Sequence, residues 1–322
     1  DYTITSGDVK LDAASLEKKW DDVLEPVFKA QLPEKSAPEK IAYTGGCELK
    51  HSSVKVAKPR VLIPVFPGTN CEYDMANAFN RYGGDSEIFV IRNLSAKDME
   101  DSVSEFTKLI GQSQIIAIPG GFSGGDEPEG SAKFINAFFR NPKIKDAVES
   151  MLYSRDGLMI GICNGFQALI KLGLVPFGKI VPLTAESPTL TYNTIGRHQS
   201  QLTLTRICTN KSPWLSCCNV GDIHNIPISH GEGRFVAPES VIKQLIANGQ
   251  VATQYVDLSG NPTMDVAFNP NSSMYAIEGI ISPDGRVLGK MGHTERLTDN
   301  VAKNVAGNKE QLLFKGGVEY FA

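Results

Sequence analysis

Residues 158–167 read LMIGICNGFQ, and this short stretch decides the fold. Its first five residues are apolar, as in a strand that is buried on both faces, and residues 164–172 have the composition of a helix. Between these two segments stands Cys163, flanked by Gly161 and Gly165. This is the layout of a nucleophile held on a tight strand-to-helix turn. We therefore predict that Cys163 projects from the carboxyl edge of a parallel sheet, at a helix N-terminus whose dipole favours a thiolate.

Strand-like and helix-like segments alternate on both sides of this turn. The predicted strands before residue 180 are 60–66, 86–91, 114–118 and 158–162, and the predicted helices are 70–82, 95–111, 130–140, 143–153 and 164–172. Such alternation predicts an α/β fold, with a mostly parallel sheet and helices on both faces. From about residue 185 the pattern changes to short strands, which we expect to be antiparallel or mixed and to cover or extend the sheet: 189–195, 201–207, 223–229, 251–255, 274–281 and 286–291.

The first 58 residues differ from the rest of the chain. Apolar residues recur at helical spacing over 13–31, which predicts one amphipathic helix, and residues 33–40 have the composition of a linker. We expect residues 1–58 to be a connector whose helix docks on a neighbour, and residues 59–322 to form the main domain. Because the sequence begins at Asp1 without a methionine or a signal peptide, we expect it to be a piece of a longer polypeptide.

Composition narrows the class of protein. The 322 residues are 41% hydrophobic and 21% charged, with a net charge of -4, which is typical of a soluble globular protein and disfavours nucleic-acid binding. No apolar run approaches the roughly 18 residues that span a bilayer. The six cysteines form no paired zinc motif and are too few for a disulfide scaffold. We expect a cytoplasmic protein, without membrane or nucleic-acid partners and without a metal, in which a cysteine can act as nucleophile.

A cysteine nucleophile needs a base, and the base needs a group that orients it. The chain has five histidines, and two of them are followed two residues later by a carboxylate: His230 by Glu232, and His293 by Glu295. Each histidine follows a predicted strand and can project from the end of the sheet. The pattern of residues alone leaves both as candidate bases, and either could instead be a histidine of a surface turn.

Acyl transfer also needs donors for the developing oxyanion. The loop 119–126 reads PGGFSGGD and follows the predicted strand 114–118, so its glycines can turn backbone N–H groups toward the site. We expect the N–H groups of Gly121 and Asn164 to be the two donors. A phosphate-binding glycine loop is the alternative, but no Gly-Lys-Ser/Thr follows it, which excludes a Walker A motif.

Taken together, the motifs at 161–167, 119–121 and 293–295 resemble those of the class I (triad) glutamine amidotransferases, a flavodoxin-like family. Longer matches at 66–72 (FPGTNCE), 120–126, 161–167 and 230–235 (HGEGRF) resemble the glutaminase domains of phosphoribosylformylglycinamidine synthases, in their long single-chain form. The resemblance extends from about residue 59 to the C-terminus. It implies that 59–322 is a glutaminase domain and that residues 1–58 connect it to a synthetase region.

The resemblance also implies roles for single residues. It carries the triad onto Cys163, His293 and Glu295, and so favours His293 over His230. It implies that glutamine binds among a small set of side chains: Phe122, Gln167, Asn193 and Arg197. Three features depart from the family pattern: Gly124 stands where Tyr is common, Thr294 where Pro is common, and 193–198 differs from the usual segment.

The implied reaction is hydrolysis of glutamine through a Cys163 thioester. The ammonia would pass to the synthetase region, which uses ATP and Mg²⁺ to convert formylglycinamide ribonucleotide to formylglycinamidine ribonucleotide in purine biosynthesis. The glutaminase domain itself would need no cofactor. Two alternatives remain: a stand-alone hydrolase of the same fold, such as a γ-glutamyl hydrolase, and a non-catalytic regulatory module. The motifs at 66–72 and 230–235 disfavour the first, and the filled triad positions disfavour the second.

Overall fold

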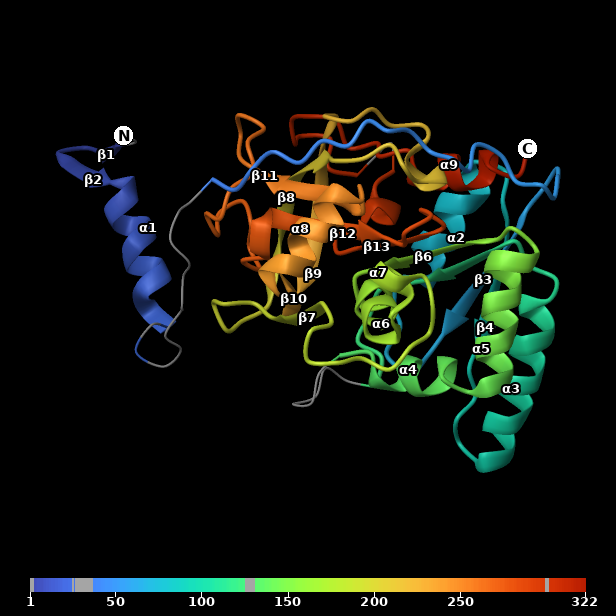
Figure 1. Ribbon diagram of the computed structural model, residues 1–322. Coiled ribbons are helices and arrows are strands. Elements are labelled where there is room, and N and C mark those ends of the chain that lie inside the picture. Colours follow the sequence, from blue (N-terminus) through green and yellow to red (C-terminus); the bar gives the residue numbers. More distant parts are fainter. Residues whose placement is uncertain (1–2, 25, 27–36, 125–130, 299–300) are drawn as a thin grey trace.

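A nine-stranded sheet forms the centre of the protein in the computed structural model, which describes residues 3–24, 26, 37–124, 131–298 and 301–322 (Figure 1). The strand order is β4-β3-β5-β6-β13-β12-β11-β8-β9. Strands from the two halves of the chain therefore meet at the β6–β13 pair in the middle of the sheet. Among the described residues, no helix is long and apolar enough to cross a membrane.

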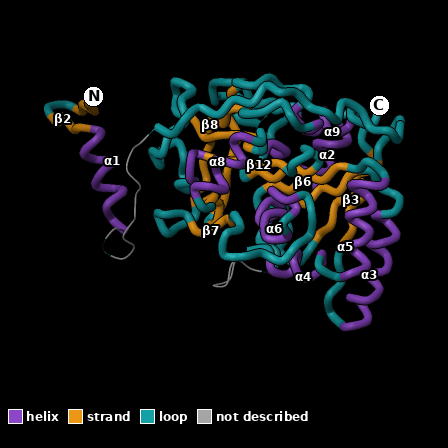
Figure 2. Tube along the Cα trace, viewed as in Figure 1, coloured by secondary structure: helices purple, strands orange, loops and turns teal. Residues whose placement is uncertain are grey.

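The first half of the sheet is parallel and agrees with the alternation in the sequence. Its strands are β3 (Arg60–Val65), β4 (Asp85–Val90), β5 (Ile115–Ile118), β6 (Leu158–Ile162) and β13 (Val287–Lys290). Helices cover both faces, as the tube view in Figure 2 shows. On one face lie α2 (Glu72–Arg81) and α9 (Leu313–Glu319), and on the other lie α3 (Ala96–Ile110), α4 (Lys133–Phe139), α5 (Pro142–Glu149) and α6 (Asn164–Leu172).

The second half of the sheet is antiparallel and extends the parallel half. It consists of β12 (Ile277–Ile281), β11 (Val251–Val256), β8 (Gln199–Ile207) and β9 (Ile223–His230). A separate two-stranded sheet pairs β7 (Thr189–Tyr192) with β10 (Glu232–Val236). Short helices complete this half: α7 (Leu174–Phe177), η3 (Pro213–Leu215), α8 (Glu239–Ala247), η4 (Met274–Ala276) and η5 (Thr294–Arg296). Of the six strands expected after residue 185, four therefore extend the sheet in antiparallel fashion, whereas β7 lies in the separate sheet and β13 pairs in parallel with β6.

Several predicted boundaries were wrong, for local reasons. The strand expected at 274–281 begins at Ile277, because Tyr275 and Ala276 have positive φ angles of 55° and 57° that no strand accommodates. The strand expected at 189–195 ends at Tyr192, where the chain turns and Gly196 N–H donates to the Asn193 carbonyl at 3.0 Å. The helix expected at 143–153 is α5 followed by a π-helical turn, Ser150–Ser154. Strand β10 and helix α8 were not predicted.

The core follows the apolar runs of the sequence. All five residues of β6 are buried, and α6 buries every residue except Lys171. A helix that is apolar on nearly all sides has to be enclosed, and α6 packs between the sheet and α4. Because β6 and α6 are both enclosed, the backbone of Cys163, which lies between them, is held in one position.

The N-terminal residues form a small unit of their own. Strands β1 (Thr3–Ser6) and β2 (Val9–Asp12) make an exposed hairpin, followed by α1 (Ala13–Asp21) and the turn η1 (Asp22–Leu24), at the left of Figure 1. Of the helix expected at 13–31, the structure has α1 up to Asp21 and then the tighter turn η1, before Pro26, which lacks the N–H group that a continuing helix needs. The remainder of that prediction, at 25 and 27–31, lies outside the described residues, as does the linker over 33–36.

Residues 37–58, predicted as part of the connector, lie along the main domain. The Ile41 side chain is buried in the core, and its N–H donates to Gln254 Oε1 at 3.0 Å. Tyr43 N–H donates to the Cys208 carbonyl at 2.8 Å, and Val56 N–H donates to the Phe321 carbonyl at 2.9 Å. This part of the chain is therefore packed against the domain that it precedes.

Candidate active site

The backbone of Cys163 is strained. The residue follows β6, directly precedes α6 as its N-cap, and has a φ of 53° and a ψ of -105°, which is unusual for a residue with a side chain. Such conformations cost about 1–3 kcal/mol and persist only where the surroundings impose them. Cys163 N–H donates to the Lys290 carbonyl on the neighbouring strand at 2.9 Å, and the side chain is 5% exposed. The predicted tight turn is present.

The two flanking glycines are required by packing. A Cβ atom on Gly161 would lie 2.6 Å from the carbonyl carbon of Gly165, and a Cβ on Gly165 would lie 2.1 Å from the carbonyl oxygen of Ile118. Helix α6 thus approaches β5 and β6 so closely that neither position has room for a side chain. This close approach sets the thiol at the carboxyl edge of the sheet.

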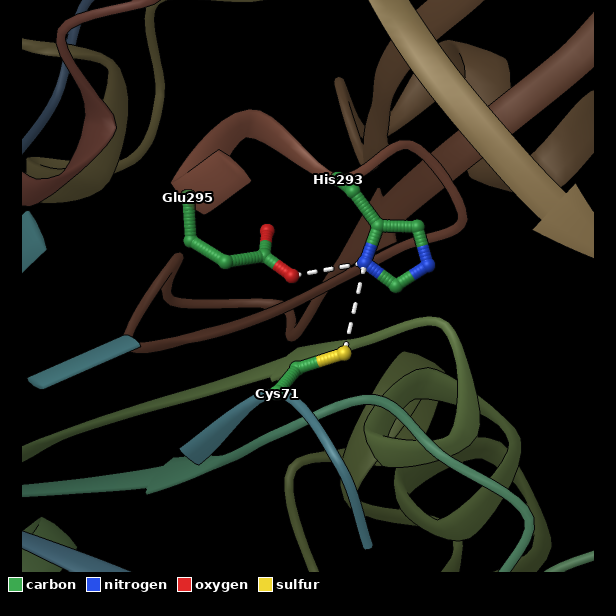
Figure 3. Close-up of side chains that lie close together, drawn as sticks. All are labelled: Cys71, His293 and Glu295. Carbon is green, nitrogen blue, oxygen red and sulfur yellow. Dashed lines mark hydrogen bonds and ion pairs between the residues drawn. The ribbon is translucent and has the colours of Figure 1, made fainter. Parts of the chain in front are cut away.

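His293 and Glu295 form a buried pair just after the C-terminal end of β13, the strand next to β6. His293 follows β13, Glu295 lies in η5, and His293 Nδ1 is 2.6 Å from Glu295 Oε1 (Figure 3). Their side chains are 2% and 0% exposed. Because β13 pairs in parallel with β6, the carboxyl ends of the two strands lie side by side. The pairing therefore brings His293 to Cys163 from 130 residues away.

The environment of His293 favours its charged form. Burial lowers the pKa of His293, but the Glu295 carboxylate and Cys163 raise it and outweigh burial, so that the pKa lies well above the usual 6.5. The proximity of the Cys163 and Cys71 side chains to the imidazole acts in the same direction on this pKa. An imidazolium beside Cys163 is the partner that a thiolate nucleophile needs.

His230 lies in a different environment. It ends β9, is 2% exposed, and within the described residues neither ring nitrogen has a hydrogen-bond partner. Burial, followed by the charges of His293 and His198, lowers the pKa of His230 to about 3. The Glu232 carboxylate is turned elsewhere and accepts from the Ser131 N–H at 3.1 Å. Of the two His-x-Glu pairs, only 293–295 joins its imidazole to its carboxylate.

The glycine loop 119–124, which follows β5, lies next to Cys163 and His293. An antiparallel bridge joins Gly121 to Thr69, with Phe122 N–H donating to the Gly68 carbonyl at 2.8 Å. Within the described part of the chain, the Gly121 N–H has no backbone acceptor. The Asn164 N–H belongs to the first residue of α6, where helices leave their N–H groups unpaired. Among the described residues, neither expected donor thus has a backbone acceptor. Gly125 and Asp126 of this motif lie outside the described residues.

Gln167 is committed to internal hydrogen bonds. Its Oε1 accepts from Asn164 Nδ2 at 2.8 Å, and its Nε2 donates to the Glu232 carbonyl. Asn164 Oδ1 in turn accepts from the Ser123 N–H at 3.2 Å. The side chain expected to bind substrate is therefore buried and joins helix α6 to the glycine loop and to β10.

The other expected binding residues keep unpaired polar atoms. Asn193 Nδ2 donates to the His230 carbonyl at 2.9 Å and to the Arg197 carbonyl at 3.1 Å, while Asn193 Oδ1 and Arg197 Nη1 are buried without a partner among the described residues. Phe122 is 39% exposed, and its ring lies 6.0 Å from that of His198. Buried polar atoms without partners are costly unless a ligand or water completes them.

One group of described residues has the composition of a metal site: Cys71, His293 and Glu295, whose ligand atoms lie within 4.8 Å of one another (Figure 3). Cys71 Sγ is 4.0 Å from His293 Nδ1 and accepts from Arg296 Nη2 at 2.8 Å. The 2.6 Å hydrogen bond between His293 and Glu295 leaves no space for an ion between them. The geometry is that of an acid–base pair with a thiol beside it.

Sequence reasoning missed Cys71 and Gly120 as neighbours of the imidazole. A Cβ on Gly120 would lie 2.7 Å from His293 Cε1 and 3.5 Å from Cys163 Cβ. The signal was present, since both residues belong to quoted motifs, 66–72 and 119–126. Their contact with His293 depends on three strands meeting at one edge of the sheet, which no spacing along the chain specifies.

Comparison with known proteins gives consistent matches. The family model for the CobB/CobQ-like glutamine amidotransferase domain matches residues 58–321. The phosphoribosylformylglycinamidine synthase subunit PurQ of Methanococcus maripaludis strain C7 is 32% identical over 286 residues, covering 82% of this chain and 97% of the relative. The PurQ subunit of Sulfurimonas denitrificans is 33% identical over 251 residues, covering 78% and 96%. The solved structure of PurLQS from Thermotoga maritima has a TM-score of 0.57 at 26% identity, covering 82% of this chain and 100% of that one.

Proposed function

Because the chain belongs to the glutamine amidotransferase family of the CobB/CobQ-like type, we propose that it hydrolyses glutamine to supply ammonia to a phosphoribosylformylglycinamidine synthase. One observation carries the proposal: the strained Cys163 and the buried His293–Glu295 pair stand at the ends of two adjacent parallel strands. A thiol, a charged imidazole and a carboxylate in this order are the parts of a triad.

The proposed reaction uses these groups in two halves. The Cys163 thiolate attacks the side-chain amide carbon of glutamine, and the N–H groups of Gly121 and Asn164 stabilise the oxyanion. The His293 imidazolium gives its proton to the departing nitrogen, so ammonia leaves and a thioester remains. A water molecule then gives a proton to the neutral imidazole and attacks the thioester, which releases glutamate and restores the thiolate. Glu295 holds the imidazole in position throughout.

We propose that glutamine is recognised next to this triad by the polar atoms that lack partners. Asn193 Oδ1 is an acceptor suited to the α-amino group, and Arg197 Nη1 is a donor suited to the α-carboxylate. The half-exposed Phe122 would cover the aliphatic part of the side chain. Gln167 would act indirectly, by fixing Asn164 and the glycine loop.

The partner in this proposal is a synthetase region that binds ATP and Mg²⁺ and consumes the ammonia, while this domain carries no cofactor. Support for a synthetase partner comes from the relatives, which are named as subunits of a phosphoribosylformylglycinamidine synthase, and from the PurLQS structure. We further propose the long single-chain form, in which residues 1–58 lead from the synthetase region to the glutaminase in the cytoplasm. The exposed Trp20 and Val23, at 79% and 66%, suit a segment that docks on another domain.

The test is glutamate release from glutamine by the wild-type chain, with Cys163→Ala, His293→Asn and His230→Asn as variants. We expect no turnover from the first two and at least a tenth of wild-type kcat from the third. A glutamine-like diazo-ketone should label Cys163 in peptide mapping. Labelling of Cys71 instead, or loss of turnover with the His230 variant alone, would refute the assignment.

A further inference from the structure

Two charged side chains are buried directly below the turn that carries His293. Lys290 ends β13 and Glu278 lies on the adjacent β12, with side chains 1% and 0% exposed. Lys290 Nζ is 3.4 Å from Glu278 Oε1. Burying two charges has a large desolvation cost, and such a pair is weak evidence for stability. Stability alone therefore does not explain why this pair lies in the centre of the sheet.

The pair holds the His293 turn from both ends. Glu278 Oε1 accepts from the Gly292 N–H at 2.6 Å, and Lys290 Nζ donates to the Gly292 carbonyl at 2.9 Å. Lys290 Nζ also donates to Thr294 Oγ1 at 3.0 Å. The residues immediately before and after His293 are therefore each tied to the same buried pair.

Lys290 also contacts the nucleophile. Its carbonyl accepts from the Cys163 N–H at 2.9 Å, while its ammonium group reaches the turn of the imidazole. One residue thus connects the strained backbone of Cys163 with the loop of His293. A Cβ on Gly292 would lie 3.0 Å from both Lys290 Nζ and Glu278 Oε1, so the turn lies closely against the pair.

Thr294 completes the arrangement. Its hydroxyl accepts from Lys290 and donates to Gln311 Oε1 at 2.8 Å, and Gln311 is buried close to α9. A proline at this position would restrict the turn through its ring but would offer Lys290 no acceptor in its side chain. In this chain the turn is restricted by hydrogen bonds from the pair.

We propose that Lys290 and Glu278 are positioning residues that set His293 against Cys163, with Gly292 and Thr294 as the contacts through which they act. The proposal rests on the proposed function, because it assigns a purpose to the placement of that base. Neither residue touches the reacting atoms. Their effect passes through the 291–295 turn, and misplacement of a catalytic group by about 1 Å can reduce a rate by about a hundredfold.

The experiment separates positioning from stability in the 322-residue chain. The variants are Lys290→Met, Glu278→Gln, the double variant and Thr294→Val. The single charge removals leave a buried unpaired charge and should lower Tm, whereas the double variant should recover much of it. Three readouts are compared: Tm, kcat and KM for glutamine, and the rate at which iodoacetamide alkylates Cys163 between pH 5.5 and pH 9.5.

We expect the double variant and Thr294→Val to lose at least tenfold in kcat with KM changed less than threefold. The alkylation rate of Cys163 at pH 6 should fall at least tenfold, because a misplaced His293 no longer sets its positive charge beside the sulfur, and should stay within twofold at pH 9.5, where cysteine thiols ionise without a cationic partner. Wild-type kcat and a wild-type alkylation profile in the folded double variant would overturn the proposal.

A matched control is the ion pair of Arg286 with Asp156, at the opposite end of the same strand and 12% and 16% exposed. The variants Arg286→Met and Asp156→Asn should lower Tm while keeping the wild-type alkylation profile. A tenfold change in that profile would show that the readout follows stability and would also overturn the proposal. Wild type and Cys163→Ala are assayed alongside, so a failure of the glutaminase function itself is seen separately.

Discussion

A single methyl group on Gly120 tests how closely the proposed triad is assembled. In Gly120→Ala the new Cβ would lie 2.7 Å from His293 Cε1 and 3.1 Å from Cys71 Sγ. Carbon atoms normally approach to about 3.5–4.0 Å, so the imidazole has to move by about 1 Å. Gly120 is not among the residues with positive φ, so alanine can adopt its backbone conformation and the effect comes from contact alone. A shift of this size should reduce kcat about a hundredfold.

The assay measures kcat and KM for glutamine together with thermal unfolding. We expect the loss in kcat, a KM within threefold of wild type and a destabilisation of about 1–3 kcal/mol from overpacking. Gly111→Ala is the control, because Gly111 has a φ of -60° at the end of α3 and lies on the surface, away from the site. A folded Gly120→Ala variant with kcat within threefold of wild type would show that the imidazole has freedom which the structure does not give it.

Three further predictions concern charge and packing. Burial, as the first cause, lowers the pKa of His230 to about 3 and that of His224 to about 4, so the unfolded chain binds more protons than the folded one below pH 6.5. Their contribution to stability is present above pH 6.5 and is lost as the pH falls. The urea midpoint of unfolding should therefore drop between pH 6 and pH 4.5. In this range His293 is protonated in both the folded and the unfolded chain, so it does not contribute to the pH dependence. His224→Gln should remove about half of this drop, which is at most about 1.4 kcal/mol per pH unit for each histidine, and a midpoint independent of pH would contradict the reasoning. Glu295→Gln should lower the pKa of His293, since burial then meets less opposition, and should reduce both kcat and the alkylation of Cys163 at pH 6 at least tenfold; an unchanged alkylation profile would contradict the role given to Glu295. Gly165→Ala should prevent correct folding, because its Cβ would lie 2.1 Å from the Ile118 carbonyl oxygen, and a soluble variant with the wild-type Tm would show that α6 can move away from the sheet.

The parallel half of the fold could be predicted from the sequence because its signals are local. The strand 158–162 is apolar throughout, and Ser95 caps α3 by accepting from the Asp98 N–H at 3.1 Å. The antiparallel half was harder, because its short strands carry no such signal at their ends. Strand β10 contains two charged residues, Glu232 and Arg234, and its partner strand β7 lies about 40 residues earlier in the sequence. Strand propensity does not specify such a pairing.

In the candidate site, too, local features could be predicted from the sequence and contacts between distant segments could not. The tight turn at Cys163 could be predicted from its two glycines, and the contact of His293 with Glu295 from their spacing, because these relations are short. The role proposed for Lys290 could not be predicted from the sequence. The segments VLGK and IEGII nevertheless show a lysine and a glutamate among apolar residues, which is a signal of a buried charged pair. Charged residues are rarely buried unless they are paired. Recognising the pair required knowing that β12 and β13 are neighbours.

The register of β6 on β13 connects these observations. Gly161 pairs with Gly289 and Ile162 with Lys290, so the chain leaves both strands at the same level of the sheet. A shift of the register by one residue would turn Lys290 to the other face and would remove both its carbonyl from Cys163 and its ammonium group from the His293 turn. A Cβ on Gly289 would lie 2.1 Å from the Phe166 ring of α6, which keeps the helix seated over this pair of strands. The placement of the proposed nucleophile and base is therefore a property of one strand pairing, and the residues that fix this pairing are as necessary to the candidate site as Cys163 and His293 themselves.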